Sequence, residues 1–263
     1  MSESKSIISS AFDGLRYVTS SFGYIRSHKL TYVYVWAFLS MVVVLGLGVG
    51  LASIIESWVG SYVEDWLQST WMPDYMVSIM SGVSSVLAWA ISFVLMFMFR
   101  GTLVLLLLSP VFTAVATKVR EDMAGLTSPF EWRAFFISIL RGVIISLRNM
   151  LLQMFFAVVI FLAGFIPFVG VLCPFLLFFV HAYYFGFSMA DYSMDVWGKN
   201  VGESIAYARK HAGYMVGFGS LYSLLILVPF IGVFIAIAVA PSCVVGSARM
   251  MAEESNRQLT DNA

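Results

Sequence analysis

The sequence predicts an all-α integral membrane protein with two long transmembrane helices, two helical hairpins broken by Pro-Gly pairs, and an N-terminal amphipathic helix. Three observations predict this fold class. Of the 263 residues, 60% are hydrophobic and 11% are charged, whereas about a quarter of the residues of a soluble chain are charged. The mean hydropathy is +0.89. The charged residues delimit apolar runs that reach the about 20 residues needed to cross a bilayer as a helix.

The charges divide a single membrane domain, 1–263, into consecutive segments. The expected segments are an N-terminal interfacial helix (1–29), the first long helix (30–57), an outer loop (58–74), the second long helix with a cytoplasmic extension (75–124), the first hairpin (142–190), a cytoplasmic linker (191–211), the second hairpin (212–250) and a polar tail (251–263). In the first segment, Arg16 is expected on an amphipathic interfacial helix, with Phe12 and Tyr17 in lipid.

Composition also argues against several classes of function. The net charge is zero, so a nucleic-acid partner held by bulk charge is not expected. The lone cysteines, Cys173 and Cys243, lie in apolar runs and are interpreted as packing residues. Motifs of metalloproteases, serine hydrolases and phosphate-binding loops do not occur in the sequence. We therefore expect neither an enzyme nor a metal or other cofactor.

Lysine and arginine predict the orientation. No basic residue occurs between Leu51 and Phe99, where four carboxylates occur, and every other connection between apolar runs is basic. The positive-inside rule places the loop 58–74 outside and both termini in the cytoplasm.

This orientation requires the last two apolar runs to reverse direction, because each begins and ends on the cytoplasmic side. The predicted reversals are Pro167–Gly170 and Pro229–Gly232. Proline ends the first arm, and glycine is expected to adopt the backbone angles of the turn. Each arm is roughly 24–30 Å long, against an apolar core of about 30 Å, so full spanning and partial penetration both stay open.

The hairpin tips have two interpretations. In one, the return helices begin inside the membrane, and free N–H groups at Gly170 and Gly232 hold an anion. In the other, the Pro-Gly pairs make ordinary tight turns between spans.

A basic cluster precedes the first long helix. Arg26 and Lys29, with His28 between them, offer a guanidinium fork and an ammonium to a tetrahedral oxyanion. The alternative is anchoring to lipid headgroups, which explains basic residues beside any span. Arg16 is a second candidate for the anion.

The linker between the hairpins carries charges of both signs. Asp191 and Asp195 are candidates for an ion-pair network with Arg209 and Lys210 that holds the hairpins together. The alternative is a set of solvated charges on a helix.

Several stretches resemble the CysZ-like sulfate permease family, which includes the etoposide-induced membrane proteins. They are "LLLLSPVFTAVATKVREDMAG", "FSMADYSMDVW", "ARKHAGYMVGFGSL", "VPFIGVFIAIAVAP" and "IRSHKL". The resemblance runs from about Phe12 to Met250. Where sulfate-transporting members carry a Gly-Leu-Arg-Arg motif, this chain has Arg26-Ser27-His28-Lys29, and its own Gly14-Leu15-Arg16 lies earlier.

The resemblance implies two long membrane helices, two partially penetrating hairpins, a homo-oligomer and sulfate uptake across a bacterial inner membrane. We therefore predict a permease or channel for sulfate or a similar oxyanion that feeds sulfur assimilation, with the lipid bilayer as its other partner. The alternative is a structural or lipid-interacting membrane protein of the same fold without transport. Polar lining behind the hairpin tips would favour transport, and sealed aromatic packing would favour the alternative.

Overall fold

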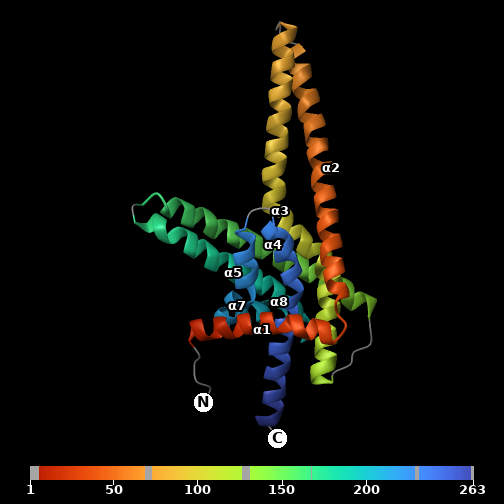
Figure 1. The fold of residues 1–263 in the computed structure, drawn as a ribbon, viewed down its shortest axis with the longest axis vertical. Helices are drawn as coiled ribbons and strands as arrows, with labels where there is room; N and C mark the ends of the chain where they lie inside the picture. Colours follow the sequence, from red (N-terminus) through yellow and green to blue (C-terminus); the bar gives the residue numbers. More distant parts are fainter. Residues whose placement is uncertain (1–5, 69–72, 126–130, 167, 229–230, 262–263) are drawn as a thin grey trace. The chain divides into compact units, whose positions relative to one another are not determined.

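A computed structural model describes residues 6–68, 73–125, 131–166, 168–228 and 231–261. Within these ranges the chain forms helices and no strands, which confirms the all-α class. The helices are α1 (Ile7–Ser27), α2 (Tyr32–Gln68), α3 (Asp74–Ala124), α4 (Trp132–Ala163), α5 (Val169–Val196), α6 (Val201–Lys210), α7 (Ala212–Ile226) and α8 (Ile231–Asp261) (Figure 1). The chain forms two compact units, residues 39–104 and residues 1–38 with 105–263.

The first unit, residues 39–104, consists of the outer parts of α2 and α3. Stretches of both helices are long and apolar enough to cross a membrane, Tyr32–Trp66 and Asp74–Phe93. Large apolar side chains such as Leu47, Trp58 and Val86 are mostly exposed, as expected of a surface in contact with lipid. The bilayer is therefore a partner of this unit.

The boundary of the first long helix differs from the prediction. The outer loop was expected from residue 58, but α2 continues to Gln68, and residues 69–72 lie outside the described residues. No proline interrupts residues 57–68, and Pro73 stands immediately before α3. Without a proline to stop it, a helix continues. At 37 residues, α2 is about 55 Å long, and so exceeds the about 30 Å apolar core of a bilayer.

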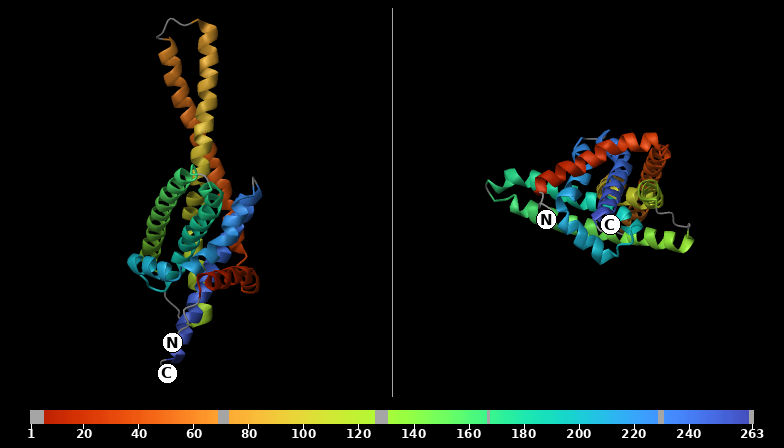
Figure 2. Two further views of the ribbon diagram at one scale, coloured as in Figure 1. Left: turned by 90° about the vertical axis from the view of Figure 1, so that its left-hand side faces the viewer. Right: turned by 90° about the horizontal axis from the view of Figure 1, so that it is seen from below.

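The second unit contains two antiparallel helix pairs, α4–α5 and α7–α8, with α1 lying across α7 and α8 (Figures 1 and 2). Two further stretches, Trp132–Ala163 and Val169–Val196, are long and apolar enough to cross a membrane. By contrast, α7 has 15 residues and is about 22 Å long, shorter than a full crossing.

Glycine allows α5 and α7 to pack at close range. A Cβ on Gly186 would lie 1.9 Å from the carbonyl oxygen of Met215, and one on Gly219 would lie 1.9 Å from that of Ala182. Small residues that let backbones approach are the usual basis of helix association in membranes, where burial of apolar surface drives little. The core around this contact includes Phe187 and Phe218, both almost fully buried.

The N-terminal helix α1 is amphipathic, as predicted. The side chain of Ser6 caps it by accepting a hydrogen bond from the N–H of Ser9 at 3.1 Å. Ile8 and Phe12 are about 70% exposed, whereas Gly14 and its helical neighbours face α7. Tyr17 was expected in lipid, but its hydroxyl donates to Glu253 of α8 at 2.6 Å.

Among the described residues, α4 ends at Ala163 and α5 begins at Val169, and α7 ends at Ile226 and α8 begins at Ile231. The arms of both pairs are longer than expected. The first arm begins at Trp132, because nothing between it and residue 142 breaks the helix. The last arm runs to Asp261 through the segment expected to be a polar tail. Pro167 and Pro229 lie outside the described residues.

The prediction that the tip glycines adopt the backbone angles of a turn and leave free N–H donors is wrong. The left-handed residue at the first tip is Phe168, with φ of 69°, and neither Gly170 nor Gly232 has a positive φ. Their amides are also occupied: Gly170 N–H donates to Ile166 O and Gly232 N–H to Val228 O. Neither glycine is a free donor for an anion.

Close packing explains these two glycines better. A Cβ on Gly170 would lie 2.9 Å from the carbonyl oxygen of Gly164, and one on Gly232 would lie 1.9 Å from that of Leu225. Glycine therefore lets the return helix begin against the end of the outgoing helix.

We predict that Gly232→Ala lowers the free energy of unfolding by about 1–3 kcal/mol, because the added methyl group meets the Leu225 backbone. The matched control is Gly23→Ala in α1, where a Cβ meets nothing within 4 Å. Alanine at that helical position is expected to be neutral or stabilising. Thermal unfolding in detergent measures both variants, and equal melting temperatures would contradict the packing role.

Candidate functional site

The turn between α1 and α2 has a defined backbone geometry. Leu30 N–H donates to Ile25 O at 2.9 Å and Lys29 N–H to Arg26 O at 3.4 Å, the two bonds of a Schellman motif. Ile25 and Leu30 are both buried and supply the apolar contact that accompanies this motif. Lys29 occupies the left-handed position, with φ of 56°, where glycine is the usual residue.

His28 caps the end of α1. Its Nδ1 lies 3.0 Å from the carbonyl oxygen of Tyr24, which only accepts, so Nδ1 carries a proton in this contact. The imidazole also stacks on the Tyr24 ring, with centroids 3.8 Å apart. Burial, with the neighbouring carboxylate of Asp122, raises the pKa of Tyr24 to about 12. Tyr24 therefore stays protonated at neutral pH.

A cavity of about 650 Å³ lies beside this turn. Its wall is formed by the α1–α2 turn, α3, the start of α4 and the end of α5. Its charged and titratable lining residues are His28, Lys29, Tyr32, Lys118, Arg120, Glu121, Glu131 and Asp195.

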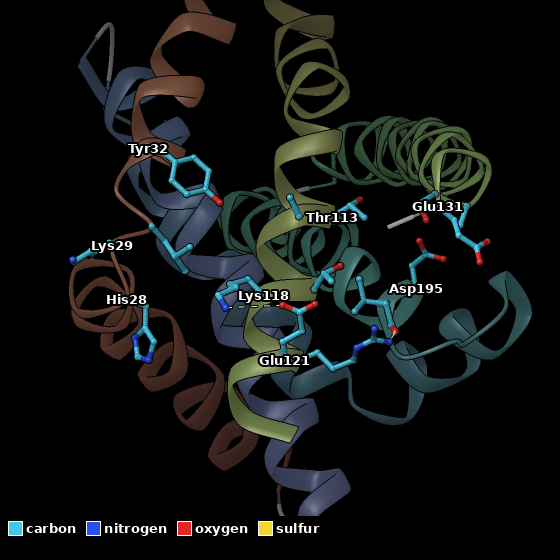
Figure 3. Close-up of a pocket in the computed structure, with 15 residues that line it drawn as sticks. His28, Lys29, Tyr32, Thr113, Lys118, Glu121, Glu131 and Asp195 are labelled. Carbon is cyan, nitrogen blue, oxygen red and sulfur yellow. Dashed lines mark hydrogen bonds and ion pairs between the residues drawn. The ribbon is translucent and has the colours of Figure 1, made fainter. Parts of the chain in front are cut away.

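Charges of both signs line this cavity. Figure 3 shows His28 and Lys29 on one side, Glu131 and Asp195 on the other, and Lys118 with Glu121 between them on α3. The Lys118 ammonium pairs with Asp122 at 2.9 Å, one turn further along α3. This hydrogen bond raises the pKa of Lys118, so the side chain keeps its charge. Lys118 is thus paired with carboxylates on α3, and Lys29 with His28 supplies the basic groups at the end of the cavity nearest the α1–α2 turn.

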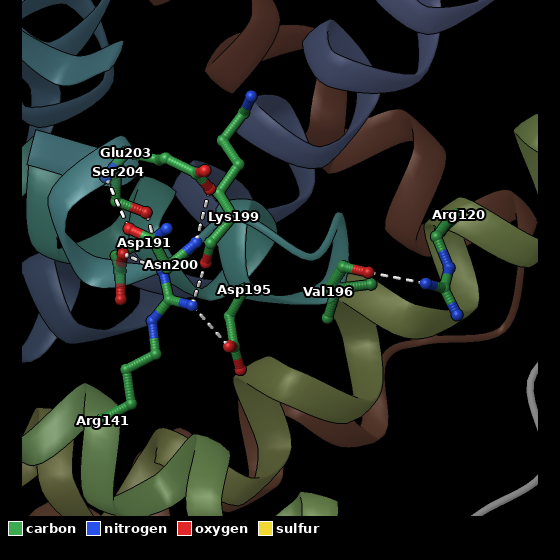
Figure 4. Close-up of polar contacts among 9 residues, drawn as sticks. All are labelled: Arg120, Arg141, Asp191, Asp195, Val196, Lys199, Asn200, Glu203 and Ser204. Carbon is green, nitrogen blue, oxygen red and sulfur yellow. Dashed lines mark hydrogen bonds and ion pairs between the residues drawn. The ribbon is translucent and has the colours of Figure 1, made fainter. Parts of the chain in front are cut away.

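A largely buried arginine binds Asp195, which lines the other end of the cavity. Arg141 of α4 donates through Nη2 to Asp191 at 2.9 Å and through Nη1 to Asp195 at 2.7 Å (Figure 4). Its side chain is 11% exposed, and that of Asp191 is 3% exposed. It also donates to Ser204 Oγ at 2.7 Å and to the carbonyl oxygen of Lys199. One guanidinium thus joins α4, α5 and α6.

The helix that follows this cluster is also well capped. Asn200 accepts from Glu203 N–H at 2.9 Å, while the Glu203 carboxylate accepts from Asn200 N–H at 2.8 Å. This reciprocal capping box begins α6.

Arg120 of α3 donates to the carbonyl oxygen of Val196 at 2.6 Å, at the end of α5. Since Asp195 and Val196 line the cavity, these contacts fix its wall.

The structure brings only some of the predicted site residues together. His28 and Lys29 line the cavity, whereas the exposed Arg26 is not among its lining residues. Arg16 lines a different cavity. Asp191 and Asp195 do form an ion-pair network, but their partner is Arg141.

The predicted partners of the aspartates lie elsewhere. Arg209 and Lys210 are exposed on α6, where basic side chains suit the C-terminal end of the helix. Gly170 and Gly232 stand at the hairpin tips and contribute packing. Side chains at the first tip, including Phe165, Phe168 and Val171, are apolar and more than 70% exposed.

Sequence reasoning missed Arg141 and Lys118. Arg141 was counted only as one of the basic residues that set the orientation. The signal that could have identified it is its place more than two turns inside an apolar helix, because a charge within such a segment usually has a specific partner. Lys118 stands four residues before Asp122 on α3, the spacing of a helical ion pair.

Four long apolar helices and a cavity lined by charged side chains define an α-helical integral membrane protein. The model of the family described as "Sulfate transporter CysZ/Etoposide-induced protein 2.4" matches residues 17–236. The chain therefore belongs to this family, which confirms the resemblance recognised in its sequence. Membership indicates a transporter-like function in the membrane. No curated protein matches the chain.

We predict that Arg141→Gln lowers the free energy of unfolding by about 3–5 kcal/mol, because it leaves two carboxylates without their buried cation. Arg133→Gln, on the exposed start of the same helix, is the matched control and should change stability little. Thermal unfolding of the purified proteins gives the comparison. Similar melting temperatures for the two variants would show that the cluster does not hold the helices together.

Proposed function

We propose that the protein is a permease or channel for sulfate or a similar oxyanion, in the inner membrane of a bacterium, where it feeds sulfur assimilation. The anion is held first by Arg26, His28 and Lys29 at the head of α2. Three facts support this site: the family, the position of His28 and Lys29 at the edge of the 650 Å³ cavity, and the geometry of the α1–α2 turn.

The observation that carries the proposal is the backbone conformation of Lys29. A non-glycine residue in the left-handed region costs of order 1–3 kcal/mol, and such strain is concentrated at functional sites. Glycine would fill this position of the Schellman motif without strain. The chain places a cation there instead, at the edge of a cavity that also contains Lys118. Phe168 at the first hairpin tip also has a positive φ but carries no charge, so the support comes from the combination of this conformation with a cation beside the cavity.

Arginine and lysine divide the binding between them in this proposal. The Arg26 guanidinium presents two parallel N–H donors to two oxygens of one tetrahedral anion, whereas the ammonium of Lys29 acts as a point charge. His28 is held by Tyr24 and contributes its second ring nitrogen. Arg26 and Lys29 are exposed, which suits a site that anions enter and leave.

The competing function, a structural or lipid-interacting protein without transport, is favoured by one observation. The first hairpin tip is apolar and exposed within the chain, as Phe165 and Phe168 show, so no polar path begins there among the described residues. We therefore propose that the anion path runs by way of the charged cavity and not the tips.

Uptake of radiolabelled sulfate into liposomes that contain the purified protein tests the function. Light scattering before reconstitution tests the homo-oligomer that the proposal includes. Uptake above protein-free liposomes supports a permease, and its absence with correctly folded protein favours the structural alternative.

The site has its own test. We expect Arg26→Gln with Lys29→Gln to weaken sulfate binding by about tenfold or more, because charge-assisted hydrogen bonds are lost, and to change chloride binding much less. Lys29→Gly separates binding from folding. It should weaken sulfate binding like Lys29→Gln, yet raise stability by about 1 kcal/mol by removing the strain. Unchanged sulfate affinity by calorimetry in the folded double variant would exclude this site.

We also propose that both termini lie in the cytoplasm, because the outer part of α2 and α3 lacks basic residues. In intact cells, a cysteine at Ser61 is expected to react with an impermeant thiol reagent, and a cysteine at Gly125 is not. Both positions are exposed within the chain. Labelling at residue 125 but not at residue 61 would show that the protein has the opposite orientation in the membrane.

A further inference from the structure

A second cavity, separate from the first, is built around arginines. It has a volume of about 390 Å³ and lies where α1, the start of α7 and the end of α8 meet. The lining residues are Asp13, Arg16, Tyr17, Ser20, Tyr214, Arg249 and Arg257. None of them lines the cavity beside Lys29, so this second cavity is not part of the site proposed above.

The walls of this arginine cavity are held by specific contacts. Arg249 donates through Nη1 to Ser20 Oγ at 2.8 Å, and its guanidinium lies over the Tyr24 ring at 5.3 Å. Tyr17 donates to Glu253 at 2.6 Å, which joins α1 to α8 at the level of the cavity. Burial and this bond to the carboxylate raise the pKa of Tyr17, so the hydroxyl remains a donor at neutral pH.

Two arginines on α8 are presented on one helical face. Arg249, Glu253 and Arg257 are spaced by four residues and so share a face of α8. The Glu253 carboxylate is engaged by Tyr17, between the two guanidinium groups. Arg16 approaches the same cavity from α1. Three cations from two helices therefore line one small volume.

The balance of charge in the cavity is positive. Its lining residues include three arginines and the carboxylate of Asp13, and the Glu253 carboxylate stands between Arg249 and Arg257. The local net charge is therefore about +1, because arginine stays protonated at all relevant pH values. Among the ion pairs formed within the described parts of the chain, none involves Arg16, Arg249 or Arg257. The guanidinium forks suit an anion with several oxygens.

The volume of the arginine cavity and the side chains of its wall favour an anion that carries an organic group. A cavity of 390 Å³ is in the range of sites for organic ligands and exceeds the space needed by a bare tetrahedral anion. Two tyrosine rings, Tyr17 and Tyr214, provide a surface for an organic group. A phosphate monoester carries a charge of about −1.5 to −2 at neutral pH, so it is attracted to the three guanidinium groups of the lining.

We propose that the arginine cavity binds a phosphate monoester, with the phosphate between Arg16, Arg249 and Arg257 and its organic part against Tyr17 and Tyr214. The same chemistry has two sources, a soluble phosphate ester and the headgroup of a monoester lipid such as phosphatidic acid. The exposed apolar side chains of α1, Ile8 and Phe12, place the helix in the membrane interface, within reach of both.

The test uses the full-length protein in nanodiscs and two probes. In phosphatidylcholine nanodiscs, calorimetry measures binding of glycerol 3-phosphate. In nanodiscs that also contain phosphatidic acid, native mass spectrometry measures the lipid retained by the released protein. Binding of glycerol 3-phosphate assigns a soluble source, and selective retention of phosphatidic acid assigns the bilayer. Binding of neither probe overturns the proposal.

Variants locate the binding. Arg16→Gln and Arg257→Gln, both at exposed positions, should each weaken binding of the successful probe by about tenfold. Arg133→Gln, an exposed arginine that lines neither cavity, should leave it unchanged. Loss of binding in all three variants would mean general charge attraction and would overturn the site. Competition by inorganic sulfate as strong as that by the ester would overturn the assignment of an ester.

Discussion

The guanidinium of Arg141 is the contact on which the polar end of the second unit depends. Its two terminal nitrogens donate to two carboxylates, a hydroxyl and a backbone carbonyl. Transfer of charged groups from water is costly, and these directional bonds offset that cost, although the buried Nε of Arg141 has no hydrogen-bond partner among the described residues. The cluster therefore links α4, α5 and α6 through one side chain. Asp195 belongs both to the cluster and to the cavity wall, so its ion pair with Arg141 fixes this part of the wall.

The apolar parts of the same unit are held by a different force. Between lipid-exposed helices the hydrophobic effect adds little, so backbone proximity and dispersion decide how they pack. The paired glycines Gly186 and Gly219 give α5 and α7 that proximity. Gly232 does the same where α8 begins against α7. Directional polar contacts at one end and close backbone packing along the helices thus complement each other.

Much of the fold was predictable because its signals are local. The second long helix was expected over 75–124 and is observed as Asp74–Ala124, since charges and a proline mark its ends. The first long helix was predicted too short, because acidic residues near its end were read as a loop although nothing there breaks a helix. The site was less predictable. Asp191 was a correct candidate, but its partner Arg141 is 50 residues away in sequence, and only tertiary packing joins them.

The tip glycines and Lys29 show why composition and conformation must be considered together. Glycine at Gly170 and Gly232 indicated unusual backbone angles, yet both adopt ordinary ones and are required by neighbouring carbonyl groups. Lysine at Lys29 gave no sign of strain, yet its φ of 56° is the one that favours glycine. At the tips, glycine is retained for the space it leaves. At the head of α2, glycine is avoided although the backbone favours it. Phe168 at the first tip shares this left-handed conformation without a charge, so conformation alone does not identify a binding residue. The anion site proposed beside the α1–α2 turn rests on the combination of this conformation with a cation at the edge of a cavity.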